Sequence, residues 1–250
     1  MNAGIFSLVL AYVLSQFFRA FLAVLTPVLG ADLGAGAEDL AFASGMWFLS
    51  FAAMQIPVGW ALDRIGPRRT STVLLCLGGG GGALVFAFAT SALHINFAML
   101  LIGIGCSPVL MSSYYIFARQ FPAAQFATLA ATMLGVGSVG NLVASYPTAM
   151  AVDLLGWRAT LVGLAVISVL VALGIWLTVK DPERVKQTEK GSVLDLLKMP
   201  ALWPIFPLML VLYAPSAAIR GLWAGPYLSD VFGQNTAQIG TATLIMGVAM

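Results

Sequence analysis

Charged side chains are scarce in this sequence. They make up 9% of the 250 residues, whereas a soluble domain carries about 25%. Hydrophobic residues reach 60% and the mean hydropathy is +0.95, so the composition excludes an ordinary soluble domain and indicates a membrane protein. The net charge of +2 is too small to suggest nucleic-acid binding. We therefore expect the lipid bilayer, and no nucleic acid, as a partner.

Cysteine and histidine are nearly absent. Cys76 and Cys106 lie in apolar runs, and His94 lies in a short loop without neighbouring ligand residues. This pattern predicts neither a disulfide framework nor a metal site. The glycine run 78–82 has no following Lys and Ser/Thr, so it is not a phosphate loop, and we expect it to serve close helix packing. Without a nucleophile–base pair or a catalytic domain, we predict no enzyme and no cofactor.

Long apolar runs dominate the chain. A helix needs about 20 mostly apolar residues to cross the hydrocarbon core of a bilayer. Runs of that length predict an all-α polytopic protein with these spans: Ile5–Leu29, Leu40–Leu62, Thr70–Ala89, Ile95–Phe117, Ala124–Ala151, Thr160–Val179 and Leu202–Leu228. Another run starts near Ile239 and is cut short at Met250, so we expect a piece of a longer protein.

One long polar stretch interrupts the apolar pattern. It covers residues 180–200 (KDPERVKQTEKGSVLDLLKMP) and follows the sixth predicted span. We interpret it as a linker between two helical bundles. The predicted domains are an N-terminal six-helix bundle at 1–179, the linker at 180–200, and the start of a second bundle at 201–250.

The loop charges predict the orientation. All but one of the Lys and Arg residues outside the spans fall in alternate loops, on one side of the membrane, and Arg158 is the exception. The positive-inside rule makes that basic side cytoplasmic. We therefore expect a multi-pass protein of the cell (inner) membrane with a cytoplasmic N-terminus.

The first and seventh predicted spans resemble each other. A tyrosine, a serine and an arginine recur at one spacing, followed in the same order by Pro, Leu, Asp and Gly; they are Tyr12, Ser15 and Arg19, and Tyr213, Ser216 and Arg220. Parallel six-span repeats are one transporter architecture, with the substrate site near the midplane between the repeats.

Arg19 and Arg220 are the charged residues within the predicted spans. Arg19 lies about 21 Å along the helix from Ile5, at about 1.5 Å per residue, and an intramembrane charge normally faces a polar cavity. Guanidinium groups match carboxylate and phosphate, and no carboxylate lies in the middle of a predicted span. Tyr12 and Gln16 share the helix face of Arg19, so both arginines are predicted to bind an anion.

The predicted substrate-binding residues follow from this placement. They are Arg19, Arg220, Tyr12, Gln16, Tyr213 and, as a weaker candidate, Gln55. The alternative is that each arginine is a structural tie to carbonyls or to a carboxylate.

A motif follows the second span: Gly59-Trp-Ala-Leu-Asp63-Arg64-Ile-Gly66-Pro-Arg68-Arg69. It resembles the signature of the major facilitator superfamily of transporters, and the Gly-Trp-Arg at 156–158 is also common there. The resemblance implies a twelve-helix fold of two six-helix bundles, of which this chain supplies the first and the start of the second. It also implies a gating role for Gly59, Asp63, Arg64, Gly66, Arg68 and Arg69. The alternative is that the arginines only fix the orientation.

The sequence also departs from that family pattern. In the fourth span, the family pattern has a basic residue shortly before Gly103, and here that position falls near Met99. In the fifth span, the pattern has proline after glycine, and here Asn141 follows Gly140. Both departures argue against proton-linked drug export.

The predicted function is secondary active transport of a small organic or inorganic anion by alternating access, by a monomer. Two alternatives stay open. One is a carrier of a neutral or metal substrate, or a drug exporter, with structural arginines. The other is a non-transporting membrane sensor or assembly factor.

Overall fold

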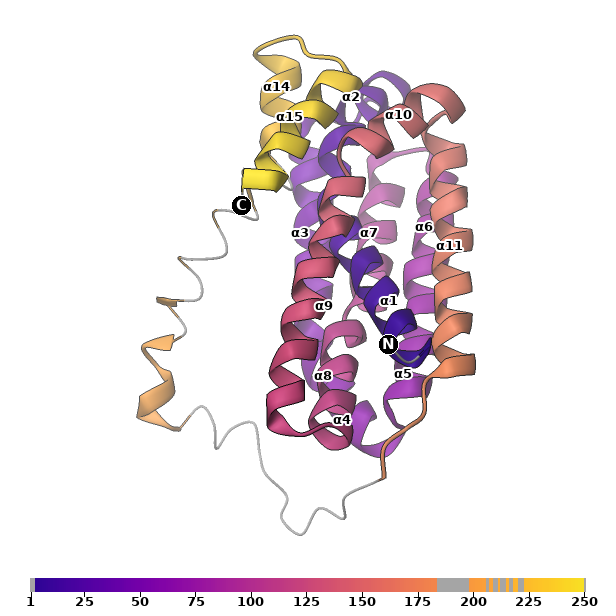
Figure 1. The fold of residues 1–250 in the computed structure, drawn as a ribbon. Helices are drawn as coiled ribbons and strands as arrows, with labels where there is room; N and C mark the ends of the chain where they lie inside the picture. The colour runs from indigo at the N-terminus through magenta and orange to yellow at the C-terminus, as the bar shows by residue number, and fades with distance from the viewer. Residues whose placement is uncertain are drawn as a thin grey trace.

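The computed structural model of the chain describes residues 3–183 and 223–249, with residues 198–205 and positions 207, 208, 211, 215, 218 and 219 between them. The described residues form a bundle of long helices without strands (Figure 1). Among them, six helices are long and apolar enough to cross a membrane. The predicted all-α, polytopic fold is therefore confirmed.

The helices follow the order of the predicted spans. The bounds are α1 Ala3–Ala20 and α2 Leu22–Leu33; α3 Ala37–Ala53 and α4 Gln55–Arg64; α5 Pro67–Leu74, η1 Leu75–Gly80 and α6 Gly81–Ala87; α7 Ala92–Cys106 and α8 Pro108–Gln120; α9 Ala123–Val143 and α10 Tyr146–Leu155; and α11 Trp157–Thr178. A short 3-10 turn η2 (Pro200–Leu202), α14 (Ala224–Asp230) and α15 (Thr236–Ala249) follow. Part of the predicted seventh span, including Tyr213 and Arg220, lies outside the described residues, and the eighth begins slightly before Ile239.

Proline explains several of the breaks within spans. Pro108 and Pro147 stand at the starts of α8 and α10, where the missing N–H costs least. Inside α2, Pro27 leaves the carbonyl of Ala23 without its helical donor. The Thr26 hydroxyl donates to that carbonyl at 2.9 Å, so the carbonyl still has a hydrogen-bond donor.

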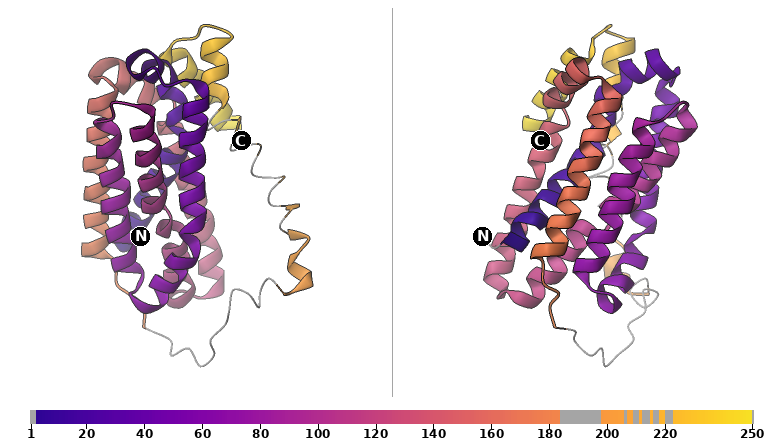
Figure 2. Two further views of the ribbon diagram at one scale, coloured as in Figure 1. Left: turned by 180° about the vertical axis from the view of Figure 1, so that it is seen from behind. Right: turned by 90° about the vertical axis from the view of Figure 1, so that its right-hand side faces the viewer.

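Figures 1 and 2 show how the spans pack. α3 lies along α7, α1 lies along α9, and α6 is held between α7 and α11. An aromatic cluster fills the half of the core near α2: Phe17, Phe18 and Phe21 contact one another, and Phe21 contacts Phe86. Phe18, Phe21 and Phe86 are fully buried.

Glycines set the distance between the central helices. A side chain at Gly78 would stand 2.6 Å from the amide nitrogen of Gly105 in α7, and one at Gly82 would stand 2.9 Å from that of Ile102. The close packing predicted for the 78–82 run is therefore what the structure has. In α9, Gly140 lies against the carbonyl of Val13 and Gly137 against the ring of Tyr12, so the fifth span approaches the first in the same way.

The C-terminal helices rest on the end of the bundle that contains α2 and α10 (Figure 1). α14 packs on α2, where Gly225 lies against the carbonyl of Ala23 and the Thr26 hydroxyl. α15 packs on α10, where Gly240 lies close to Tyr146 and Ala149. The first and fifth spans thus contact the described C-terminal helices α14 and α15.

The glycine contacts predict an asymmetric response to one methyl group. Gly105→Ala forces a Cβ to within 2.6 Å of the Gly78 backbone, and overpacking of this kind costs about 1–3 kcal/mol. Gly163→Ala is the matched control, because Gly163 is helical and has open space around it. The thermal unfolding midpoint in detergent should fall for the first variant and stay or rise for the second. Equal midpoints would contradict this account.

Candidate functional site

Three of the predicted site residues share one face of α1. Tyr12 is buried, and Gln16 and Arg19 are half-buried. The Gln16 amide nitrogen donates to the Tyr12 hydroxyl at 3.0 Å, while Gly137 of α9 makes room for the Tyr12 ring. The sequence spacing therefore placed these side chains in one row. Arg19 ends the row in the last turn of α1, where the partial negative charge of the helix C-terminus favours a cation.

Aromatic rings of α3 form a wall beside Arg19. The guanidinium carbon lies 5.2 Å from the centre of the Trp47 ring and 5.7 Å from that of Phe51. The two rings stack on each other at 5.0 Å. A cation over a ring face is attracted by the ring quadrupole, and more strongly where water is excluded. Arg19 is thus held between the first and second spans, inside the bundle.

Gln55 belongs to the same wall. It begins α4, and its amide nitrogen donates to the carbonyl of Phe51 at 2.9 Å. Trp47, Phe51 and Gln55 stand at intervals of four residues, so they follow one helix face. Trp47 and Phe51 were not predicted from the sequence. The only sequence feature that points to them is their position eight and four residues before Gln55, and two aromatic residues at such positions look like ordinary core.

The predicted site residues of the seventh span, Tyr213 and Arg220, lie outside the described residues. The structure therefore brings together Tyr12 and Gln16, and Arg19 with Trp47 and Phe51, while Gln55 follows along the helix face of the two rings. The pairing of the two arginines stays a prediction.

The predicted gating motif lies at the other end of the bundle from α2 and α10, which we call the motif end (residues 63–69, 119–122 and 180–183). Gly59 of α4 lies near Met111 of α8. On the same side of α4, the Asp63 carboxylate is 3.9 Å from the Arg119 guanidinium. Arg119 also lies over the Tyr115 ring at 3.5 Å. The ends of the second and fourth spans are joined through these contacts.

A second carboxylate at the motif end was not singled out from the sequence. Asp181, just after α11, accepts a hydrogen bond from the Arg68 amide at 2.8 Å and lies against Gly66. Gly66 has φ +104°, a conformation that only glycine adopts without strain. The Arg68 guanidinium lies 4.3 Å from the Trp176 ring centre. The third and sixth spans are joined in this way.

A comparable cluster joins three spans at the opposite end. The Asp32 carboxylate accepts hydrogen bonds from the Trp157 indole at 3.1 Å and from Arg158 at 3.0 Å. The other nitrogen of the Arg158 fork donates to the carbonyl of Ala89 at 3.1 Å. We call Asp32, Trp157 and Arg158 the clasp. The sequence had located these residues in separate loops but gave no sign that they meet.

In the described part of the chain, these features define an α-helical membrane bundle with the charged Arg19 held inside it and a polar cluster at each end. Residues 8–250 match the sequence profile of the Major Facilitator Superfamily, and the chain belongs to that family. Membership, with transporters among the relatives, agrees with the prediction that the chain is not an enzyme.

Curated relatives show what kinds of substrate similar chains are named for. The chain is 24% identical over 159 residues to a probable sulfoacetate transporter, SauU, of Cupriavidus necator, covering 64% of this chain and 37% of that protein. It is 28% identical over 156 residues to the 4-hydroxybenzoate transporter PcaK of Pseudomonas putida, covering 60% and 34%. The chain thus spans well under half the length of these relatives.

Solved structures show the same fold. A bacterial homologue of the human lysosomal transporter Spinster, in an inward-facing and occupied conformation, superimposes with a TM-score of 0.76. The alignment covers 98% of this chain and 58% of that one at 20% identity.

The clasp can be tested by a double-mutant cycle. The side chains of Arg158 and Asp32 are 44% and 52% exposed, so the pair itself should contribute about 0.2–1 kcal/mol. Arg158→Lys should lose nearly as much as Arg158→Gln, because an ammonium group does not span Asp32 and Ala89 as the fork does. Thermal unfolding of Asp32→Asn, Arg158→Gln and the double variant measures the coupling. Strict additivity would show that the two side chains do not interact.

Proposed function

We propose that the complete protein is a secondary active transporter that moves a small organic anion by alternating access. The observation that carries the proposal is the position of Arg19, half-buried within an apolar bundle and held against Trp47 and Phe51. A guanidinium is costly to keep in such a place, and intramembrane charges are by default functional. Its planar fork matches a carboxylate, sulfonate or phosphate group.

The relatives support this substrate class. Sulfoacetate, 4-hydroxybenzoate and gallate appear in the names of transporters that match this chain, and each of these compounds bears an acidic group. The acidic group is what they share, while the remainder differs between a two-carbon chain and an aromatic ring. This favours a site that recognises the anionic group first.

The side chains around Arg19 suit such a ligand. The two rings beside the guanidinium restrict where the Arg19 side chain can lie, so less further ordering is needed when an anion binds. The buried Trp47 indole N–H makes no hydrogen bond within the described chain, and the Tyr12–Gln16 pair adds polar groups on the same face of α1. Tyr213 and Arg220 would complete the site from the second bundle, in keeping with the internal repeat.

We propose a gating role for the motif end. The contacts Asp63–Arg119 and Asp181–Arg68 join four spans there. The first is an ion pair and the second a hydrogen bond from a backbone amide. An exposed ion pair is weak, which suits contacts that break and reform as the bundles rock. In the orientation that the loop charges predict, this gate faces the cytoplasm.

The anion site is tested by substitution at Arg19 in the full-length protein. Arg19→Gln should weaken binding of 4-hydroxybenzoate or sulfoacetate by about ten- to a hundredfold, the equivalent of a charged hydrogen bond worth about 1.5–3 kcal/mol. Arg19→Lys should fall between, because it keeps the charge but loses the fork. Lys180→Gln, which removes an exposed charge at the motif end, is the control. Calorimetric titration gives the affinities.

Two further measurements separate the alternatives. The neutral amide of 4-hydroxybenzoate should bind much more weakly than the acid. If the amide binds equally well, or if Arg19→Gln leaves the affinity for the acids unchanged, the arginine is a structural tie and a neutral substrate takes the place of the anion. Counterflow in proteoliposomes should show exchange, whereas binding without exchange would favour a membrane sensor.

A further inference from the structure

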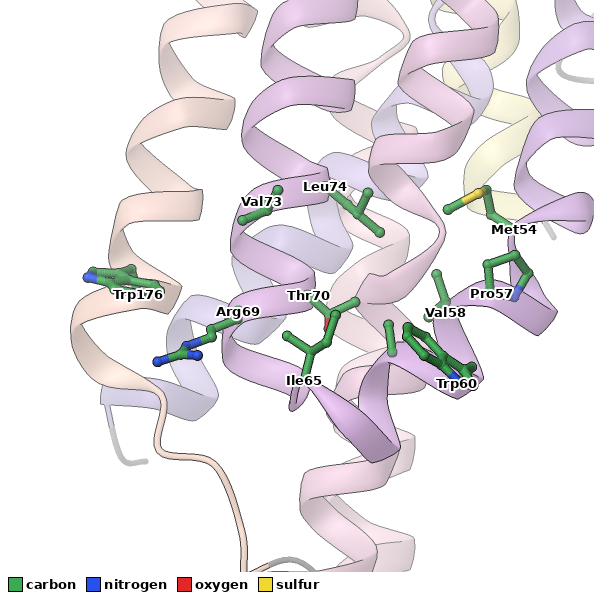
Figure 3. Close-up of a pocket in the computed structure, with 11 residues that line it drawn as sticks. Met54, Pro57, Val58, Trp60, Ile65, Arg69, Thr70, Val73, Leu74 and Trp176 are labelled. Atoms are coloured by element: carbon green, nitrogen blue, oxygen red, sulfur yellow. The ribbon is translucent and has the colours of Figure 1, made fainter. Parts of the chain in front are cut away.

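An apolar groove lies on the outside of the bundle near the motif end (Figure 3). It has a volume of about 510 Å³, within the roughly 300–1,000 Å³ of ligand pockets. Three spans line it: the second with Met54 and, in α4, Pro57 and Trp60; the third with Thr70 and Val73 in α5; and the sixth with Trp176 in α11. Apart from Arg69 and Thr70, every lining residue is apolar or aromatic.

The groove is on the face of α4 that turns away from the neighbouring helix α8. Gly59 and Asp63 face α8 through Met111 and Arg119. Ala61, which lines the groove, is two residues from each of them, a rotation of about 200° around the helix. Trp60, Val73 and Trp176 are all exposed. Six helices of the described chain are long and apolar enough to cross a membrane, and an exposed apolar face on such helices suits contact with lipid.

Tryptophan and arginine mark the rim of the groove. Trp60 and Trp176 are the residue type that gathers where the hydrocarbon core meets the headgroups. Arg64 lies over the Trp60 ring at 5.4 Å and Arg68 over the Trp176 ring at 4.3 Å. Figure 3 shows Arg69 between Trp176 and Ile65, at the polar end of the groove. Long arginine side chains of this kind extend their charge toward the headgroup layer.

The charge at this rim is not balanced by a carboxylate of the described residues. Asp63 pairs with Arg119 on the other side of α4, and Asp181 accepts a hydrogen bond from the Arg68 amide. Within the described chain, the side chains of Arg64 and Arg69 make no ion pair or hydrogen bond. A carbon-lined groove with an uncompensated guanidinium at its polar end is complementary to an acyl chain that carries a negative headgroup.

We propose that this groove binds an anionic phospholipid from the leaflet at the motif end. One acyl chain lies between α4, α5 and α11, and the headgroup phosphate is bound by Arg69, with Arg64 adding to the positive potential. The lipid then touches the second, third and sixth spans at once. On the outer surface, the lipid thus connects the ends of helices that the contacts of Asp63 and Asp181 join on the inner side.

The experiment measures thermal unfolding of the full-length protein in detergent, with added dioleoyl-phosphatidylglycerol or dioleoyl-phosphatidylcholine. A ligand that binds only the folded state raises the midpoint with its concentration, so phosphatidylglycerol should raise it more than phosphatidylcholine. Arg69→Gln should remove most of the difference between the two lipids. Lys180→Gln, which removes an exposed charge at the same end outside the groove, should keep it.

The apolar part of the site has its own matched pair. Val73 and Val166 are 49% and 53% exposed, and only Val73 lines the groove. Val73→Trp fills the groove and should abolish the response to both lipids, whereas Val166→Trp should respond like the wild type. If Val73→Trp does not fold, the Arg69→Gln variant tests the proposal, because Arg69 is exposed.

Three results would overturn the lipid site. They are an equal response of the wild type to both lipids, an unchanged lipid preference in Arg69→Gln, and an equal shift with glycerol 1-phosphate, which would assign the rim to free phosphate. None of these readouts involves transport, so they are independent of the proposed anion site.

Discussion

Keeping a guanidinium inside an apolar helical bundle is the constraint on which the central part of this structure depends. Arg19 is placed at the C-terminal end of α1 and over the faces of Trp47 and Phe51. Helix carbonyls and ring quadrupoles supply the negative potential that bulk water would otherwise give. The proposed anion site uses this same guanidinium.

Close helix contacts make that placement possible. The glycines at 78–82 and Gly105 bring the third and fourth spans together, and Gly137 and Gly140 bring the fifth span onto Tyr12. Lipid gives little hydrophobic drive for helices to associate, so small residues and dispersion contacts must hold them. Rigid packing around α1 then fixes the row of Tyr12, Gln16 and Arg19, while the polar contacts that tie the spans lie at the two ends, where water is available.

The spans are joined differently at the two ends of the bundle. At one end the clasp joins the first, third and sixth spans through Asp32, Arg158 and the carbonyl of Ala89. At the other end the contacts of Asp63 and Asp181 join the spans in pairs. On the outer surface next to these pairs, the groove beneath Arg69 offers a place where the surrounding lipid touches the same helices.

Sequence alone determined the membrane class, the first six spans and the row of polar residues on α1, because hydrophobic run length and helical period are local properties. The sequence also predicted that the glycine run at 78–82 serves close helix packing, because such a run within a bilayer span has few other roles. It could not predict that Asp32 meets Arg158, that Asp181 meets Gly66, or that Trp47 and Phe51 flank Arg19. Those contacts join residues far apart in the chain, and only the packing of the spans, set by backbone approach at glycine, brings them together.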